Sequence, residues 1–163
     1  MGKTRCLVKN NYLLAAAALM LVVAVVCGVA RPLSFASKME QRERQVKQRL
    51  AEIRAAEENY CLAMGHYTAN LDTLVALGLL KDGRQVIPGS RGRRFQTAVG
   101  TVKMQSGRTV PIMECGARYD EYLEGLDPGE IAAQVERADA EARYPGLKIG
   151  DLTQPNDNKG NWE

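Results

Sequence analysis

The polar C-terminal segment, residues 151–163, carries the side chains of this sequence that are best suited to a metal ion. Its oxygen ligands are Asp151, Asn156, Asp157 and Asn158. Carboxylate and amide oxygens are the ligands that calcium prefers. The spacing does not match an EF-hand loop, because Lys159 occupies the place before Gly160. Calcium is therefore one possible ligand of this segment, and the sequence indicates no other cofactor.

Two cysteines in the part of the chain that follows the apolar run could form a disulfide. Cys61 falls near the end of a predicted helix, and Cys115 falls at the end of a predicted strand. An oxidising compartment would let them pair, and two buried free thiols are the alternative. Both interpretations stay open at this point. Neither a C-x-x-C motif nor a Cys/His cluster occurs, which argues against zinc.

The sequence shows no recognisable catalytic arrangement. The single histidine, His66, falls in a predicted turn, and no Ser or Cys stands in a nucleophile elbow. No Gly-rich loop opens a helix in the way that a phosphate site requires. The acidic pairs Glu57-Glu58 and Asp120-Glu121 are interpreted as solvated helix faces. We therefore expect that this protein is not an enzyme.

The charge balance argues against nucleic acid as a partner. The chain has 163 residues and a net charge of +3, which Lys3, Arg5 and Lys9 supply, because the remaining 19 Lys/Arg balance the 19 Asp/Glu. The region beyond the N-terminus is neutral overall, whereas binding to a phosphate backbone needs a basic face. The length suits one domain with an anchor.

An apolar run near the N-terminus predicts a membrane anchor. Leu13 to Ala30 are 18 residues without a charge, and a helix of this length covers about 27 Å, close to the hydrocarbon thickness of a bilayer. We expect a basic segment over residues 1–12 and a transmembrane helix over residues 13–35. A signal peptide cleaved after Ala36 is the alternative, although the run exceeds the roughly 7–15 apolar residues usual there.

The charges that flank this span do not set its orientation by number alone. Three Lys or Arg precede it and six follow within twenty positions, which would place the C-terminal side in the cytoplasm. Long domains are nevertheless exported largely regardless of charge, and the first residues form a typical basic leader region. We expect the N-terminus inside and the domain outside.

A long helix is predicted to follow the span over residues 36–64. Arg31-Pro32 is expected to break or kink the chain, and Ser37 to Glu40 matches a capping box that restarts a helix. An apolar stripe at helical spacing includes Met39, Val46, Leu50 and Ile53. Because this stripe begins at the membrane surface, we expect it to contact partner helices.

The remaining sequence predicts a small α+β domain over residues 65–150. We expect a short helix over 71–77 capped by Asn70, a β-hairpin of strands 95–104 and 109–115, a helix from Pro128 to about Ala142, and a short strand over 147–149. The predicted fold class is α+β: a transmembrane helix, then a long amphipathic helix packed on a small antiparallel hairpin or sheet, with a C-terminal helix. Trp162 is expected to dock the tail on this domain.

The order of these elements resembles the type IV pilins and the type II secretion pseudopilins. The residues that carry the resemblance lie roughly between positions 50 and 80. They are Ala55, Ala56, Glu57, Tyr60, Gly65, Tyr67, Leu71, Leu74, Leu77 and Gly78. The whole chain also looks like membrane-anchored proteins of Bacteroidetes. Unlike pilins, it has Asn10-Asn11-Tyr12 in place of a Gly-Phe-like processing site, and it has no acid within the span.

The resemblance implies a pilin-like fold and a structural role. It implies a single-pass protein of the bacterial inner membrane, with its domain in the periplasm, that belongs to a secretion or pilus-type envelope assembly. The partners would be the membrane and either envelope assembly proteins or further copies of the chain. Without the processing site and the acid, we expect a fixed component rather than a polymerising one. A tethered or released periplasmic module that binds calcium or a glycan is the alternative.

Overall fold

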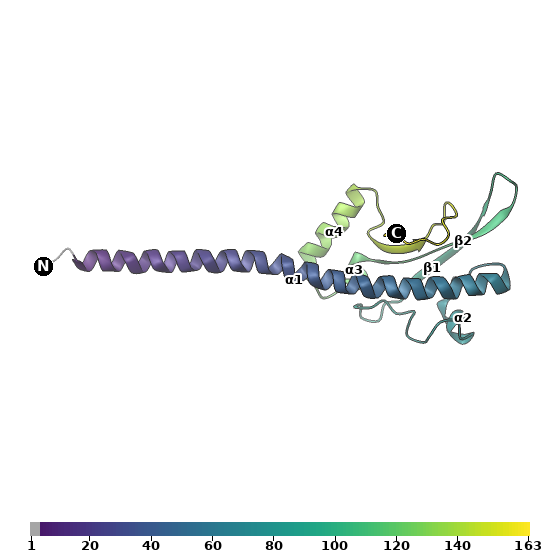
Figure 1. The fold of residues 1–163 in the computed structure, drawn as a ribbon, viewed down its shortest axis with the longest axis horizontal. Helices are drawn as coiled ribbons and strands as arrows, with labels where there is room; N and C mark the ends of the chain where they lie inside the picture. The colour runs from purple at the N-terminus through teal and green to yellow at the C-terminus, as the bar shows by residue number, and fades with distance from the viewer. Residues whose placement is uncertain (1–3) are drawn as a thin grey trace. The chain divides into compact units, whose positions relative to one another are not determined.

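The computed structural model describes the backbone of residues 4–163 and the side chains of residues 11–25 and 34–163. The elements in chain order are α1 (Thr4–Met64), α2 (Leu71–Ala76), β1 (Gln96–Lys103), β2 (Thr109–Arg118), α3 (Tyr119–Tyr122), α4 (Pro128–Ala140) and β3 (Gly146–Gly150) (Figure 1). Helices and one antiparallel sheet make this an α+β fold, as the sequence predicts. The chain divides into two units, Met1–Lys38 and Met39–Glu163.

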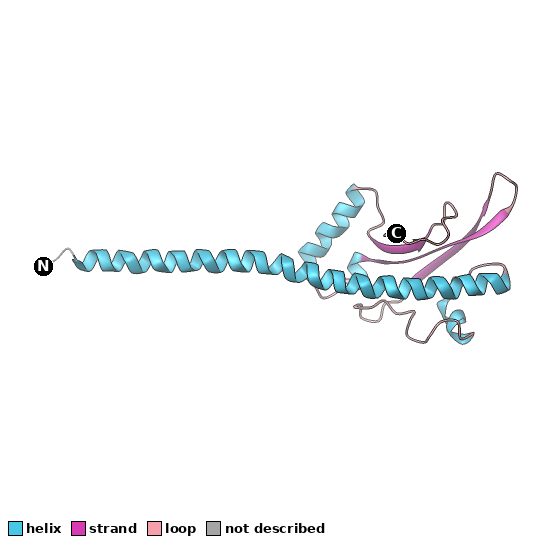
Figure 2. Ribbon diagram, in the orientation of Figure 1, coloured by secondary structure: helices cyan, strands magenta, loops and turns pink. Residues whose placement is uncertain are grey.

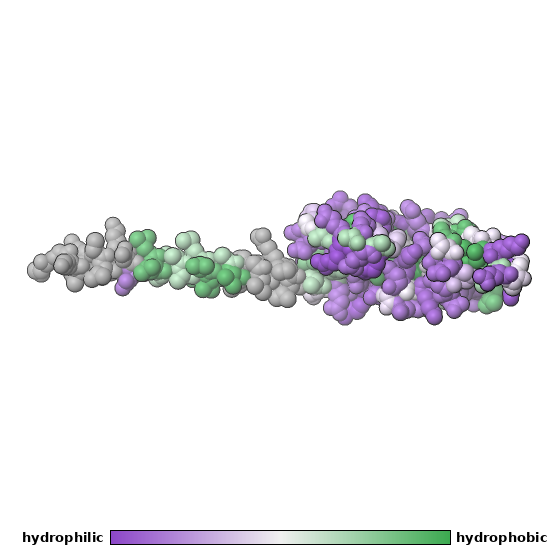
Figure 3. All heavy atoms as spheres, turned by 90° about the horizontal axis from the view of Figure 1, so that it is seen from above, coloured by the Kyte–Doolittle hydropathy of each residue, from purple (hydrophilic) through white to green (hydrophobic). Residues whose placement is uncertain are grey.

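The first unit is helical from Thr4 onward. Each residue from Leu13 to Val25 is Ala, Val, Leu or Met, and each of these side chains is exposed. Figure 3 shows this segment as a run of apolar atoms. In the part of the chain whose side chains are described, no helix has both the length and the apolar composition needed to cross a membrane. The span expected over residues 13–35 includes residues 26–33, whose side chains lie outside that part.

The expected break of the helix at Arg31-Pro32 is wrong, because α1 extends from Thr4 to Met64 without an interruption. A proline inside a helix removes one backbone hydrogen bond and costs about 3 kcal/mol. The bonds of the neighbouring turns are enough to continue the helix across this position. Ser37 therefore lies inside α1 and does not cap a new helix.

One stripe of α1 fills the core of the second unit. Val46, Leu50 and Ile53 are fully buried, at the spacing of one helix face. The inward side chains of β2 complete this core: they are Met113, Cys115 and Ala117. Arg42 fixes the start of the stripe, because its Nη1 donates to the carbonyl oxygens of Tyr122 at 2.9 Å and Glu124 at 2.8 Å.

The three strands form an antiparallel sheet in the order β1-β2-β3 (Figure 2). The hairpin pairs Gln96 with Gly116 at one end and Lys103 with Thr109 at the other. β3 pairs with the second half of β2, from Glu114 opposite Gly150 to Arg118 opposite Gly146. The expected hairpin and the expected last strand are both confirmed.

Side-chain caps begin α2 and α4, as the sequence predicts for these two helices. The Asn70 side chain accepts a hydrogen bond from the backbone N–H of Asp72 at 2.9 Å, and α2 follows. Asp127 Oδ1 accepts from the N–H groups of Gly129 at 2.9 Å and Glu130 at 3.2 Å, with Pro128 in the first turn of α4. Each cap satisfies amide groups that a helix start leaves without partners.

The C-terminal tail docks on the second unit, as expected from Trp162. Asn161 binds β3 with its backbone N–H to the Lys148 carbonyl at 3.0 Å and its side-chain oxygen to the Lys148 N–H at 3.2 Å. The Lys47 ammonium of α1 lies 5.8 Å from the centre of a Trp162 ring, and Arg54 pairs with Glu163 at 2.9 Å. The tail thus joins the third strand to the core helix.

We expect Leu50→Ala to lower the free energy of unfolding by about 2–5 kcal/mol, because it leaves a cavity in a fully packed site. Denaturant titration followed by circular dichroism measures this change. Gln48→Ala on the exposed face of α1 is the matched control and should stay within about 0.5 kcal/mol of the wild type. Equal stabilities of the two variants would contradict the described core.

Candidate functional site

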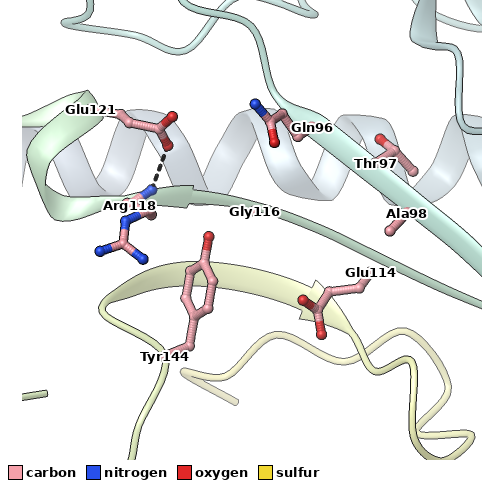
Figure 4. A pocket seen from close by; sticks show the side chains of 8 residues that line it. All are labelled: Gln96, Thr97, Ala98, Glu114, Gly116, Arg118, Glu121 and Tyr144. Carbon is pink, nitrogen blue, oxygen red and sulfur yellow. Dashed lines mark hydrogen bonds between the residues drawn. The ribbon is translucent and has the colours of Figure 1, made fainter. Parts of the chain in front are cut away.

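A pocket lies on the face of the sheet that points away from the core. Alternate residues of a strand share a face, so Glu114, Gly116 and Arg118 of β2 lie opposite the buried side of that strand. Their neighbours in the sheet are Gln96 and Ala98 of β1 and Lys148 of β3. Figure 4 shows the side chains around this hollow, which we call the Gly116 pocket. Its volume is about 310 Å³, and its lining residues are Gln96, Thr97, Ala98, Glu114, Gly116, Arg118, Glu121 and Tyr144.

Gly116 creates the hollow because it contributes no side chain at the middle of the face. A Cβ atom at this position would lie 2.9 Å from the Tyr144 hydroxyl oxygen and 3.0 Å from the Lys148 Cβ. Tyr144, which follows α4, can therefore reach across β3 with its hydroxyl group toward β2 (Figure 4). Any larger residue at 116 would collide with this arrangement.

The charged groups of the Gly116 pocket have partners close by. Lys148 Nζ lies 2.7 Å from Glu114 Oε2, and Arg118 Nε lies 3.2 Å from Asp120 Oδ1. Glu121 Oε2 accepts a hydrogen bond from the backbone N–H of Arg118 at 2.8 Å. Glu114, Arg118 and Glu121 thus line the pocket, Lys148 and Asp120 stand beside it, and the five groups together carry a net charge of −1.

Tyr144 stays a neutral phenol at physiological pH. Burial, together with the charge of Glu121, raises the pKa of its hydroxyl group to about 12, against the opposing effect of Arg118. The Lys148 ammonium lies 5.6 Å from the centre of the Tyr144 ring. Among the described residues, none forms a hydrogen bond with the Tyr144 hydroxyl, which is free to donate to or accept from a ligand.

Glu57 is buried in the core, so the interpretation of Glu57-Glu58 as one solvated face is wrong. Glu57 has no exposed surface, whereas Glu58 is exposed. The Glu57 Oε2 atom accepts a hydrogen bond from the backbone N–H of Thr68 at 3.0 Å. The Glu57 Oε1 atom has no partner within the described part of the chain. Burial raises the pKa of Glu57 to about 7, against the effect of the Thr68 bond. The second predicted pair lies at the surface, with Asp120 exposed and Glu121 half-buried.

The position of Glu57 could have been recognised from the sequence. It stands four residues after Ile53, on the same helix face as Val46 and Leu50. A carboxyl group that continues an apolar stripe is a signal for a buried acid, and its neighbour Glu58 obscured it. No comparable signal marks the Gly116 pocket, whose members come from β1, β2, α3 and the segment after α4.

Cys61 and Cys115 are both free thiols. Cys115 is fully buried, and this burial raises the pKa of its thiol to about 12; Glu57 adds to the shift and Thr97 opposes it. Burial also raises the pKa of the half-buried Cys61, whereas its hydrogen bond with Tyr67 lowers that pKa by a smaller amount. Both side chains are therefore protonated and unreactive at neutral pH. The disulfide expected as one alternative is not formed in this structure.

The predicted partner-helix interface is wrong for three of its four residues. Val46, Leu50 and Ile53 are covered by the protein's own domain, and Met39 is half-buried. The expectation assumed that the domain leaves this stripe uncovered near the membrane. The sheet and the segments around it cover this stripe of α1 from Val46 to Ile53, so a partner must use other surfaces.

The predicted calcium ligands Asp151, Asn156, Asp157 and Asn158 come together around one cavity of about 90 Å³. Three of the four, Asp151, Asn156 and Asn158, already have hydrogen-bond partners within the protein. Asp151 Oδ1 accepts from Thr153, and the Asn158 amide donates to Tyr67 at 2.9 Å and Glu58 at 3.3 Å. Among the described residues, no three His, Cys, Asp or Glu side chains form a group that could hold a metal.

The comparisons with known proteins add no relative. The chain matches no model of a protein family, no curated protein and no solved structure.

Glu57 is expected to make the stability of the protein depend on pH. Its pKa is raised in the folded state, so the folded protein binds more protons than the unfolded chain between about pH 4.5 and 7, and stability falls as pH rises through this window. Glu57→Gln keeps the shape of the side chain. It should remove the wild type's decline in the free energy of unfolding across this pH window, which is on the order of 1–3 kcal/mol. Denaturant titrations between pH 5 and 8 measure the difference between the two proteins.

Glu58→Gln is the matched control, because its side chain is exposed one residue away. This variant should keep the pH profile of the wild type. Parallel profiles for the wild type and Glu57→Gln would contradict a buried, titrating Glu57.

Proposed function

We propose that this chain is a non-enzymatic, pilin-like, single-pass protein of the bacterial inner membrane, with its domain in the periplasm. Its role is that of a fixed structural component of a secretion or pilus-type envelope assembly. The observation that carries the anchor is the exposure of the apolar helical segment Leu13–Val25 on all sides. Exposed apolar area costs about 25 cal/mol per Å² in water, and a helix that is apolar all round needs an apolar environment.

The arrangement of α1 and the sheet supports the pilin-like part of the proposal. The helix that carries the apolar segment at its N-terminal end supplies the core stripe of the second unit at its C-terminal end. The inward side chains of β2, in an antiparallel sheet, complete the core over that stripe. A long N-terminal helix that serves both as anchor and as core is what the resemblance to pilins implies.

Other apolar side chains replace the buried stripe as the proposed partner surface. They stand near the C-terminal end of α1 and just after α2. These exposed residues are Leu62, Met64, Leu77 and Leu79. The Leu62 side chain is 86% exposed, which is costly in water and is relieved when a partner covers it.

The anchor is tested by placing charges in the apolar segment. Leu19→Lys combined with Val22→Lys should move the protein from carbonate-washed membranes to the soluble fraction, because each lysine costs about 2.5–3.5 kcal/mol at the centre of a membrane helix. Thr101→Lys with Gln105→Lys adds the same charge in exposed positions and should leave the protein in the membrane. A mature N-terminus at Ser37, measured by mass spectrometry, would overturn retention of the anchor.

The assembly role is tested at Leu62. Leu62→Asp should remove the partners, or the second copy of the chain, that co-purify with the wild type after crosslinking in native membranes. Asn59→Asp adds the same charge at an exposed site of α1 and should keep them. Unchanged partners in the Leu62→Asp variant, with the circular dichroism of the wild type, would contradict this surface.

A further inference from the structure

We propose that the Gly116 pocket binds a neutral carbohydrate of one or two sugar rings. The inference goes beyond the proposed function, since a structural component of an assembly does not require a soluble ligand. It depends on the outer face of the sheet and on Tyr144, and not on the anchor or on Leu62.

The size and construction of the pocket suit a small ligand. Its volume of about 310 Å³ lies at the lower end of the range found for small-molecule sites. Two paired strands form its floor, and Tyr144 and Glu121 stand beside them (Figure 4). Because the floor is held by backbone hydrogen bonds, the polar groups keep their positions before a ligand arrives.

The charges of the pocket disfavour an ionic ligand. An anion would meet Glu114 and Glu121 in the lining, and a cation would meet Arg118 in the lining and Lys148 beside Glu114. The Lys148–Glu114 contact of 2.7 Å and the Arg118–Asp120 contact of 3.2 Å already compensate these groups. An apolar ligand would bury charged side chains without giving them partners, which is unfavourable. A neutral ligand rich in hydroxyl groups avoids each of these costs.

The pocket offers hydrogen-bonding groups of both kinds to such a ligand. Glu114 and Glu121 each have one carboxylate oxygen without a hydrogen-bond partner in the described part of the chain, and these accept from hydroxyl groups. The Gln96 amide and the Tyr144 hydroxyl can both donate and accept. Sugar hydroxyl groups also donate and accept, so one ring can satisfy several of these groups together.

The test is calorimetric titration of the full-length protein in dodecylphosphocholine, a detergent without a sugar headgroup. The neutral probes are cellobiose and maltose; glucosamine and glucuronate carry one positive and one negative charge on a similar ring. We expect saturable binding of at least one neutral disaccharide. Tyr144→Phe should weaken it about three- to tenfold, the effect of losing one hydrogen bond.

Ala98→Phe fills the pocket from the exposed face of β1 and should abolish binding. Thr101→Phe places the same ring on β1 outside the pocket and should bind as the wild type does. Circular dichroism verifies that both variants are folded. Three results would overturn the inference: no saturable binding of either disaccharide, tighter binding of glucosamine or glucuronate, or unchanged affinity in both Tyr144→Phe and Ala98→Phe.

Discussion

The burial of one face of α1 is the interaction on which the rest of the domain depends. A three-stranded sheet with short connections does not bury enough apolar surface to be stable without a layer on one of its faces. Val46, Leu50 and Ile53 supply that layer, and β2 directs Met113, Cys115 and Ala117 to it. This choice of face also decides the chemistry outside, because it turns Glu114 and Gly116 toward solvent. The Gly116 pocket is thus a consequence of the way the core is packed.

The same layer contains one carboxyl group that works against stability. Glu57 keeps a single bond to the Thr68 N–H, and its other oxygen has no partner within the described residues. Its raised pKa means that the core is best satisfied when the group is protonated. Glu57 also ties the turn after Met64 to the helix, since Thr68 lies in the connection to α2. Glu57 therefore positions the connection to α2, and the cost is a buried carboxylate charge without a partner at higher pH.

The sequence was sufficient for features that depend on local chemistry. Asn70 and Asp127 start their helices as capping predicts, and the strands of the hairpin follow from alternation around a glycine turn. It was insufficient where distant segments meet. Whether α1 is covered at Val46 depends on the sheet, and the hollow at Gly116 depends on where Tyr144 comes to lie. Pro32 differs from the prediction for a related reason, because the local preference of proline against helix is outweighed by the turns on either side.

The docked tail sets a limit on when the domain can fold. The core helix is synthesised long before Asn161, Trp162 and Glu163, which close on β3 and on Lys47 and Arg54 of α1. Contacts between residues far apart in the sequence form slowly, because a long loop must close before they are made. The apolar segment Leu13–Val25 is therefore synthesised well before the contacts that complete the second unit can form, and any process that acts on the N-terminal helix during synthesis meets a domain whose final closure has not yet taken place.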